Sequence, residues 1–304
     1  MDSAALKYGR ILSRVYSTAW AIQGRRLADI VDVLQFQAHG GKLSADEIRE
    51  YVGVQAAAPR EQSSGAIQVL GLRGIISHRM EMMNDVSGPG GTSVEQFTQR
   101  FRAAMNSPNV SAVVIDVDSP GGAVDGVPEL AAEIRQARGT KPIIAHANTL
   151  AASAAYWLAS QADEVVVTPS GEVGSIGVFA AHRDISEQLA MDGEKVTLIH
   201  AGKYKTEGNP YEPLSEEARD EIQRKVDGAY IDFLEAVAAG RGVSTKKART
   251  DFGEGRTLSA RDALAAGMVD RVETFDATLD RVRGRVSAQR RRAAALVDFD
   301  LAFA

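Results

Sequence analysis

AVVIDVDSPGGAVDG, at residues 112–126, decides the fold class of this chain. Its first half, AVVIDVD, is a β-branched run typical of a strand buried in a parallel sheet. Pro120, Gly121 and Gly122 follow at once, which predicts a tight turn with free backbone amides and no obstructing side chains. In parallel α/β folds, functional groups collect where strands end and helices begin. The stretch therefore predicts a parallel α/β fold and marks one junction as a candidate site, although an isolated PGG is also common as a plain turn.

Strand-like and helix-like segments alternate on both sides of this stretch. A strand pair or one long bent strand is expected at 66–76, with further strands at 112–118, 141–147, 164–169 and 196–200. Helices are expected at 93–106, at 127–137, from about residue 152, and at 215–242. This alternation predicts an α/β protein with a mostly parallel sheet covered by helices.

The remaining segments predict additions at both ends of the main domain. Residues 1–52 have the apolar spacing of helices, with Ser44 placed to cap a second helix. Residues 53–65 have the Ala/Pro/Ser/Gly composition of a linker, and residues 66–275 form the main domain. Residues 276–304 are first basic and then apolar, which predicts a helical tail.

Composition excludes several classes of function. The formal net charge of −5 argues against a broad basic surface, so nucleic acid is not an expected partner. The chain has no cysteine, which excludes disulfide scaffolds, zinc–thiolate sites and thiol catalysis. The glycine turn lacks both common phosphate-binding patterns. The sequence shows neither the apolar core of a signal peptide nor an apolar run of about 18 residues, so a cytosolic protein without a membrane anchor is expected.

A second junction lies in NTLAASAAYWLASQADEVVV, residues 148–167. There Ser153 stands between two alanines where a helix should begin. Serine often caps a helix through its hydroxyl, and that is the simpler interpretation. The alternative is a nucleophile beside the unpaired amides of a helix N-terminus, which can stabilise the charge of a tetrahedral intermediate. From the residues alone both interpretations stay open.

A nucleophilic serine needs a base within hydrogen-bond reach. None of the five histidines lies in a familiar triad motif. Lys203 and Lys205 lie in HAGKYKTEGNPYEPLS, residues 200–215. A lysine acts as a base only when neutral, so burial has to lower its pKa from a reference of about 10.4. Lysines in loops are more often simply solvated.

Five blocks follow one another along the chain: VVIDVDSPGG, AASAAYWLAS, GEVGSIGV, HAGKYKTEGNPYEPLS and GRTLSARDALAAGMVD. With these blocks in this order, the sequence resembles the signal peptide peptidase A family of serine–lysine proteases. The resemblance is closest to its bacteriophage branch, the capsid assembly proteases, and covers roughly residues 66–275.

The resemblance implies a role for each matching residue. It places the nucleophile on Ser153 and the general base on Lys205, with Ser175 orienting the lysine amine. It assigns the oxyanion hole to backbone amides, those of Ala154 and of Gly122, with Gly121 as its neighbour. The family's cellular members tend to have glycines and paired tyrosines after the nucleophile. This chain has Ala154, Ala155, Tyr156 and Trp157, which puts a carried-over substrate preference in doubt.

The resemblance also implies a fold, a chemistry and a setting. The fold is that of the Clp protease and crotonase group, assembled as a homo-oligomer. The chemistry is peptide-bond hydrolysis through an acyl-enzyme, with no metal or nucleotide cofactor. The expected substrates are scaffold, capsid or portal proteins of a phage head, cleaved within the procapsid in the bacterial host cytoplasm.

Three alternatives remain at this point. The first keeps the fold but uses a Ser-His-Asp triad with His182 as the base. The second is a bacterial peptidase that degrades signal peptides, and the third is a catalytically decayed structural or scaffold protein. Separately, the loop at 78–91, with Met80, Met82 and Met83, fits a substrate groove or subunit contact as well as it fits a mobile surface loop.

Overall fold

A computed structural model of the chain describes residues 8, 11–44, 47–48, 63–64, 66–79 and 91–302. The predicted linker at 53–65 and the methionine loop at 78–91 lie largely outside these residues, and Met80, Met82 and Met83 lie wholly outside them.

The described residues form one ten-stranded sheet that is mostly parallel. The main strand order is β10-β7-β6-β5-β3-β2, and all neighbours except β3 and β2 run parallel. These strands are β10 (Arg271–Val272), β7 (Glu164–Val167), β6 (Ile143–Ala152), β5 (Ala112–Ala123), β3 (Ile67–Ser77) and β2 (Ser63–Ser64). The predicted α/β class with a mostly parallel sheet is confirmed.

Short strands extend the sheet near the carboxyl ends of its central strands. β4 (Thr92–Ser93) runs parallel to β3, and β8 (Glu172–Gly174) runs parallel to β6. β9 (Thr257–Ser259) is antiparallel to β8, and β1 (Trp20–Ile22) is antiparallel to β5. Four separate parts of the chain therefore converge where a parallel sheet usually carries its site.

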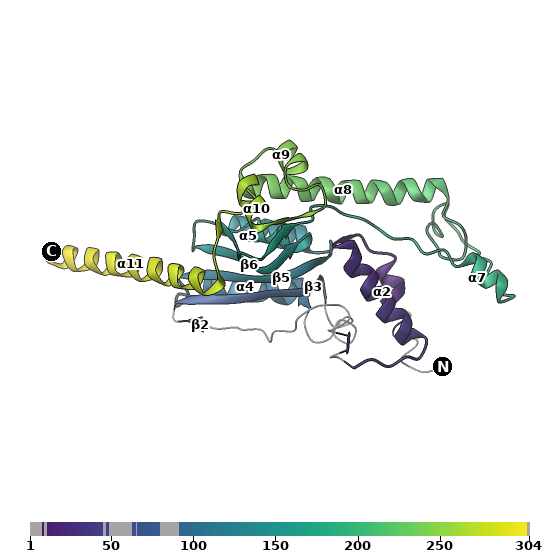
Figure 1. The fold of residues 1–304 in the computed structure, drawn as a ribbon, viewed down its shortest axis with the longest axis horizontal. Coiled ribbons are helices and arrows are strands. Elements are labelled where there is room, and N and C mark those ends of the chain that lie inside the picture. Colours follow the sequence, from purple (N-terminus) through teal and green to yellow (C-terminus); the bar gives the residue numbers. More distant parts are fainter. Residues whose placement is uncertain are drawn as a thin grey trace.

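Helices cover both faces of the sheet because the central strands are apolar on both sides. Along β5, Val113, Ile115 and Val117 belong to the larger core, whereas Ala112 and Val114 belong to a second core on the opposite face. The helices that close the larger core include α4 (Val94–Asn106), α5 (Val127–Gln136), α6 (Ala154–Ala159) and α8 (Glu216–Arg241). The smaller core is closed by the start of α11 (Phe275–Ala302), which then projects beyond the sheet (Figure 1).

Helix α8 is long because its ends are well capped and its centre is anchored. The Ser215 hydroxyl accepts the Ala218 N–H at the start, and Gly242 ends the helix in the left-handed conformation. At its centre, Phe233 stacks on Trp157 of α6 with ring centroids 4.5 Å apart. Two smaller helices, α9 (Thr245–Thr250) and α10 (Ala260–Ala266), follow before the chain reaches β10.

Residues 180–214, here called the arm, extend away from the sheet between β8 and α8 (Figure 1). The arm contains α7 (Ser186–Met191), which has no buried residue. Ile199 is 96% exposed, and the predicted strand at 196–200 is not formed. That prediction was wrong because the apolar run lies in the arm, where no strand pairs with it.

The N-terminal segment combines a helix with a strand. Helix α2 (Gly24–Ala38) buries Ile30, Val33 and Leu34, the residues whose spacing predicted it. The predicted cap at Ser44 is present, since its hydroxyl accepts the Glu47 N–H. Trp20–Ile22, in contrast, form β1 instead of a helix.

The glycines at 121 and 122 do not form the predicted turn. Strand β5 continues through Ala123, with Gly121 and Gly122 paired to β1 on one side and β3 on the other. The chain turns at Gly126, which has a φ of 82° and precedes α5. A side chain at Gly122 would collide with the Ile76 carbonyl at 1.8 Å, so this glycine permits close strand packing.

Candidate active site

Ser153 lies at the junction of β6 and α6, where the resemblance places the nucleophile. Its backbone has φ 55° and ψ −119°, a conformation that non-glycine residues rarely adopt. The Ser153 N–H donates to the Gly174 carbonyl at 2.7 Å, which ties the junction to β8. A strained strand-to-helix turn of this kind presents a nucleophilic hydroxyl in α/β enzymes. Strain held in place by neighbours is a pointer to function.

The structure favours one of the two interpretations of Ser153. Its side chain makes no capping hydrogen bond to α6. The hydroxyl instead donates to the Gly177 carbonyl at 3.4 Å, on the opposite side of the junction. A cap would require its oxygen to accept an N–H from the first turn. The hydroxyl therefore does not serve the helix.

The two sequence junctions meet in space. A Cβ built on Gly121 would lie 3.0 Å from the Ser153 Cβ and 3.0 Å from the Ala152 carbonyl oxygen. Gly121 has a φ of 102°, and its N–H donates to the Ser119 hydroxyl at 3.1 Å. The same hydroxyl donates to the Gly74 carbonyl at 2.6 Å. Ser119 thus fixes the glycine pair against the serine.

The backbone groups predicted for the oxyanion hole lie beside Ser153. Ala154 begins α6, so its N–H is one of those without an acceptor inside the helix. Gly122 stands in register with Ala21 of β1. The assignment of their amides to an oxyanion hole stays a prediction.

Ser175 follows β8 and has a second unusual backbone conformation, with φ 54°. Its N–H donates to the Arg256 carbonyl at 2.8 Å. Ser175 lines a cavity of about 630 Å³ together with the start of α2 and the segment before β9, namely Gln23, Gly24, Arg25, Arg26, Asp29, Gly255 and Thr257. Because this cavity is open at the surface, the residue predicted to orient the base faces a space that another chain can enter.

Lys205 is not brought to Ser153 within one chain. It lies exposed in the arm, and among the described residues its ammonium has no hydrogen-bond or ion-pair partner. Lys203 is engaged instead: its ammonium contacts Glu217 at 2.8 Å and the Tyr204 hydroxyl at 2.8 Å. The hydrogen bond to Glu217 raises the pKa of Lys203, which disfavours a neutral amine. The single chain thus places the nucleophile and the predicted base apart.

His182, the base of the triad alternative, also lies in the arm. Its Nε2 contacts the Asn209 carbonyl, also in the arm, at 3.1 Å. Nothing in this geometry favours a histidine over a lysine as the base.

The short helix α6 that follows Ser153 is held in place by contacts with the rest of the fold. All six residues of α6 are buried, and the Tyr156 hydroxyl donates to the Met268 carbonyl at 2.8 Å. Burial raises the pKa of Tyr156, so this phenol stays a neutral donor. The aromatic pair Tyr156 and Trp157 therefore fixes the position of the junction.

Two features of the sheet that carries Ser153 were not predicted. Strand β1 lies against the Gly121–Gly122 segment, and the sequence WAI carries no pattern strong enough to predict it. The second is a partly buried ion pair between Arg73 of β3 and the buried Asp116 of β5, which the repeated aspartates of DVD could have indicated. Asn148 of β6 donates to the same carboxylate at 3.2 Å.

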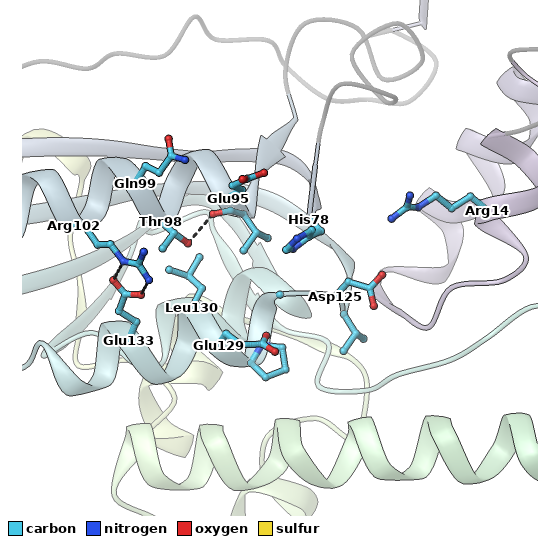
Figure 2. A pocket seen from close by; sticks show the side chains of 14 residues that line it. Arg14, His78, Glu95, Thr98, Gln99, Arg102, Asp125, Glu129, Leu130 and Glu133 are labelled. Carbon is cyan, nitrogen blue, oxygen red and sulfur yellow. Dashed lines mark hydrogen bonds and ion pairs between the residues drawn. The ribbon is translucent and has the colours of Figure 1, made fainter.

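A second and larger cavity, of about 740 Å³, lies elsewhere. Its lining comes from α4, α5 and the N-terminal segment, as Figure 2 shows, and includes Arg14, His78, Glu95, Arg102, Asp125 and Glu133. Arg102 and Glu133 close part of it with an ion pair at 2.7 Å. None of the predicted catalytic residues lines this cavity.

Comparisons with known proteins point to one family. Residues 135–289 match the model of peptidase family S49. The chain is 31% identical to capsid assembly protease C of Escherichia phage lambda over 76% of its own length and 52% of that protein. It is 33% identical to head-tail preconnector protein GP5 of Enterobacteria phage P21 over 78% of its own length and 46% of that protein. A solved structure of a mutant ClpP1 from Listeria monocytogenes is similar with a TM-score of 0.41 and 14% identity, over 68% of this chain and 91% of that chain.

The chain spans about half the length of these two phage relatives. None of the described helices combines the length and the apolar character that crossing a membrane requires.

Proposed function

Because the chain belongs to peptidase family S49, we propose that it is a serine endopeptidase that hydrolyses peptide bonds through an acyl-enzyme on Ser153. The strained Ser153 at the β6–α6 junction, with Gly121 directly against its side chain, is the observation that carries this proposal. A hydroxyl that does not cap its helix and lies beside a glycine backbone fits a nucleophile.

The proposed reaction uses Lys205 as general base and acid. The neutral amine takes the Ser153 proton as the hydroxyl oxygen attacks the peptide carbonyl carbon. The amides of Ala154 and Gly122 stabilise the oxyanion. The resulting ammonium protonates the departing amine, which leaves the acyl-enzyme. A water molecule then gives its proton to the amine and attacks the ester, and the Ser153 oxygen leaves with a proton from the lysine.

We infer that Lys205 reaches the Ser153 of a neighbouring copy. The arm extends away from its own sheet and is largely exposed, whereas Ser175 faces an open cavity. An arm that packs into the Ser175 cavity of a neighbour would bury the lysine and bring it toward that neighbour's serine. This arrangement makes the homo-oligomer a requirement of catalysis.

The biological role follows from the named phage relatives. Since these are a capsid assembly protease and a head-tail preconnector protein, we propose that the chain cleaves scaffold, capsid or portal proteins. The reaction would take place in the procapsid, in the cytoplasm of the bacterial host. A cellular role in degrading signal peptides is the second candidate, since the chain is also 29% identical to Protease 4 of Salmonella typhi over 70% of its length.

The first test is a set of three variants assayed with casein and with a phage scaffold protein. Ser153→Ala and Lys205→Ala should each abolish cleavage, whereas Lys203→Ala should keep it, because that lysine is engaged with Glu217. Circular dichroism and gel filtration should show that all three variants keep their fold and assembly. Full activity of either of the first two variants rejects the dyad.

Mixing the two inactive variants tests the neighbouring copy. A co-assembled mixture of Ser153→Ala and Lys205→Ala subunits contains sites with an intact serine facing an intact lysine from another chain. Such mixtures should regain part of the wild-type activity. A mixture that co-assembles and stays inactive contradicts the contribution of a second copy and leaves the serine assignment standing.

A further inference from the structure

Strand β1 is held on both of its edges by backbone segments that flank Ser153. On one edge, the Gln23 N–H donates to the Pro120 carbonyl at 3.1 Å, and the Val124 N–H donates to the Ala19 carbonyl at 3.1 Å. On the other edge, Trp20 and Phe179 exchange both backbone hydrogen bonds, at 2.8 Å and 3.0 Å. A three-residue strand thus fills the gap between the end of β5 and the segment that follows Ser175.

Ala21 lies at the centre of this arrangement. Along antiparallel strands, hydrogen-bonded residue pairs alternate with non-hydrogen-bonded pairs. Because the pairs Ala19–Val124 and Gln23–Pro120 are hydrogen-bonded, the pair between them, Ala21 and Gly122, is hydrogen-bonded as well. The Gly122 N–H, which the proposed reaction needs for the oxyanion, therefore faces the Ala21 carbonyl. A Cβ added to Gly121 would lie 2.2 Å from the Ala21 carbonyl oxygen. The same added atom would lie 3.0 Å from the Ser153 Cβ. The Ala21 carbonyl and the Ser153 side chain thus border the same point.

Ser153 is fully buried under this cover, with 0% exposure. Extended peptides bind to proteins by adding a strand to a free sheet edge through main-chain hydrogen bonds. Here the edges beside the nucleophile already carry such a strand. A substrate peptide and β1 cannot use the same backbone groups at the same time.

We propose that β1 is a built-in occupant of the substrate cleft, and that it must leave before a peptide reaches Ser153. This inference rests on the proposed function of Ser153. The chain thereby limits its own activity until β1 is displaced.

The attachment of β1 is suited to such a release. The strand is three residues long, and only the Ala21 side chain enters the main core. Trp20 and Ile22 pack instead in a separate cluster with Leu27 and Ile30 of α2, which Ile75 of β3 and Ala123 of β5 join from the sheet. The Trp20 indole also donates to the Val15 carbonyl at 2.8 Å. The strand itself is therefore joined to the main core by one small side chain.

A reversible cross-link tests the proposal in the intact chain. Trp20 and Ala123 are partners in β1 and β5 and form a non-hydrogen-bonded pair, whose spacing suits a disulfide. The natural chain has no cysteine, so Trp20→Cys with Ala123→Cys creates a single possible bridge. The oxidised protein should be labelled at Ser153 by a fluorophosphonate, and should hydrolyse casein, at least about tenfold more slowly than the same sample after reduction.

Each outcome has a defined meaning. Equal rates in the oxidised and reduced forms overturn the proposal, and failure of the cysteines to pair in the folded protein overturns the register on which it rests. The wild-type chain under the same redox treatment is the control and should not respond. If wild-type Ser153 is neither labelled nor active in any assembly state, the proposed function fails and the inference fails with it.

A second pair of variants approaches the question from the opposite side. Ala21→Glu places a carboxylate at a position with 0% exposure and should expel β1, which raises the labelling rate of Ser153 several-fold. Ala19→Glu is the matched control, because Ala19 lies two residues earlier and is only partly buried. An unchanged or lower labelling rate in a folded Ala21→Glu protein contradicts the proposal.

Discussion

The backbone of Gly121 lies directly against the side chain of Ser153, although 32 positions separate them in the chain. The contact is possible because Gly121 has no Cβ and adopts a φ of 102°. It brings the end of β5 to the start of α6 and joins the two junctions that the sequence marked separately. The relationship makes Gly121 a sensitive position for both stability and activity.

Gly121→Ala should therefore destabilise the fold and abolish cleavage. The new methyl group would meet the Ala21 carbonyl oxygen at 2.2 Å, in addition to the strain of a positive φ. The combined loss should be about 3 kcal/mol or more in the free energy of unfolding, measured by urea denaturation. Gly139→Ala is the control: it has a φ of 78° but nothing within 4 Å of the new atom, so a loss of only ~1 kcal/mol is expected. Similar losses of unfolding free energy in both variants would show that the close packing around Gly121 does not contribute to stability.

The stacking of Trp157 on Phe233 supports the nucleophile junction from the other side. Phe233 is fully buried, with ring planes 6° from parallel to Trp157. Phe233→Ala should cost ~3–5 kcal/mol of unfolding free energy through the cavity it leaves. Ile231→Ala, two positions away on the same helix, should cost less than ~1 kcal/mol because Ile231 is 48% exposed. Thermal denaturation should give a lower melting temperature for Phe233→Ala than for Ile231→Ala. Equal melting temperatures would contradict the supporting role of the stacked ring.

The parts of the fold that the sequence predicted are those set by local pattern. The β-branched run of β5 and the apolar face of α4, with Phe97 and Phe101, identify their elements without reference to the rest of the chain. Ser215 and Gly242 marked the two ends of α8 in the same way.

The parts that were missed depend on distant partners. Strand β1 exists because β5 and Phe179 offer it two edges, and the residues that pair with it lie at least 99 positions further along the chain. The PGG segment stayed extended for the same reason, since pairing to β1 and β3 overrides the turn preference of its glycines. The exposed run at 196–200 has a strand-like composition but no partner strand.

For the candidate site, the sequence predicted the residue types but not their geometry. Ser153 was identified by its neighbours in the chain, whereas its backbone strain is imposed by Gly174 and the surrounding core. The separation of Lys205 from Ser153 could not be predicted, because the length and direction of the arm leave no periodic signal.

His146 predicts a loss of stability in mild acid. The side chain is fully buried under α11, with Nδ1 3.1 Å from the Thr278 hydroxyl and the ring edge on Phe275. Burial lowers the pKa of His146 to about 4, whereas the carboxylates of Asp116 and Glu273 oppose this shift and Arg281 adds to it. The unfolded chain binds a proton near pH 6.5 and the folded chain only near pH 4. Stability from this group is therefore complete above about pH 6.5 and falls as the pH drops toward 4.

The measurement is urea unfolding of the wild type and His146→Gln at pH 7 and pH 5. Between pH 7 and pH 5, the free energy of unfolding of the wild type should fall by about 2 kcal/mol relative to that of the variant. His200→Gln, at an exposed position, is the control for the substitution itself. A difference for His146→Gln that does not change with pH would show that the buried imidazole is not kept neutral.

The charges around Ser175 predict the pH dependence of catalysis. Arg25, Arg26 and Asp29 line the cavity into which the base of a neighbouring copy would pack, and two of the three are cationic. Positive neighbours favour a neutral amine, so activity rises at lower pH than it would without them. Arg25→Gln should therefore move the rising limb of the kcat/KM profile upward by ~0.5–1 pH unit, and Asp29→Asn should move it downward. Arg102→Gln, in the cavity between α4 and α5, changes the same net charge far from Ser175 and should leave the profile in place. Shifts of the same sign in Arg25→Gln and Asp29→Asn would show that the base does not enter this cavity, because opposite charges beside one titrating amine must act in opposite directions.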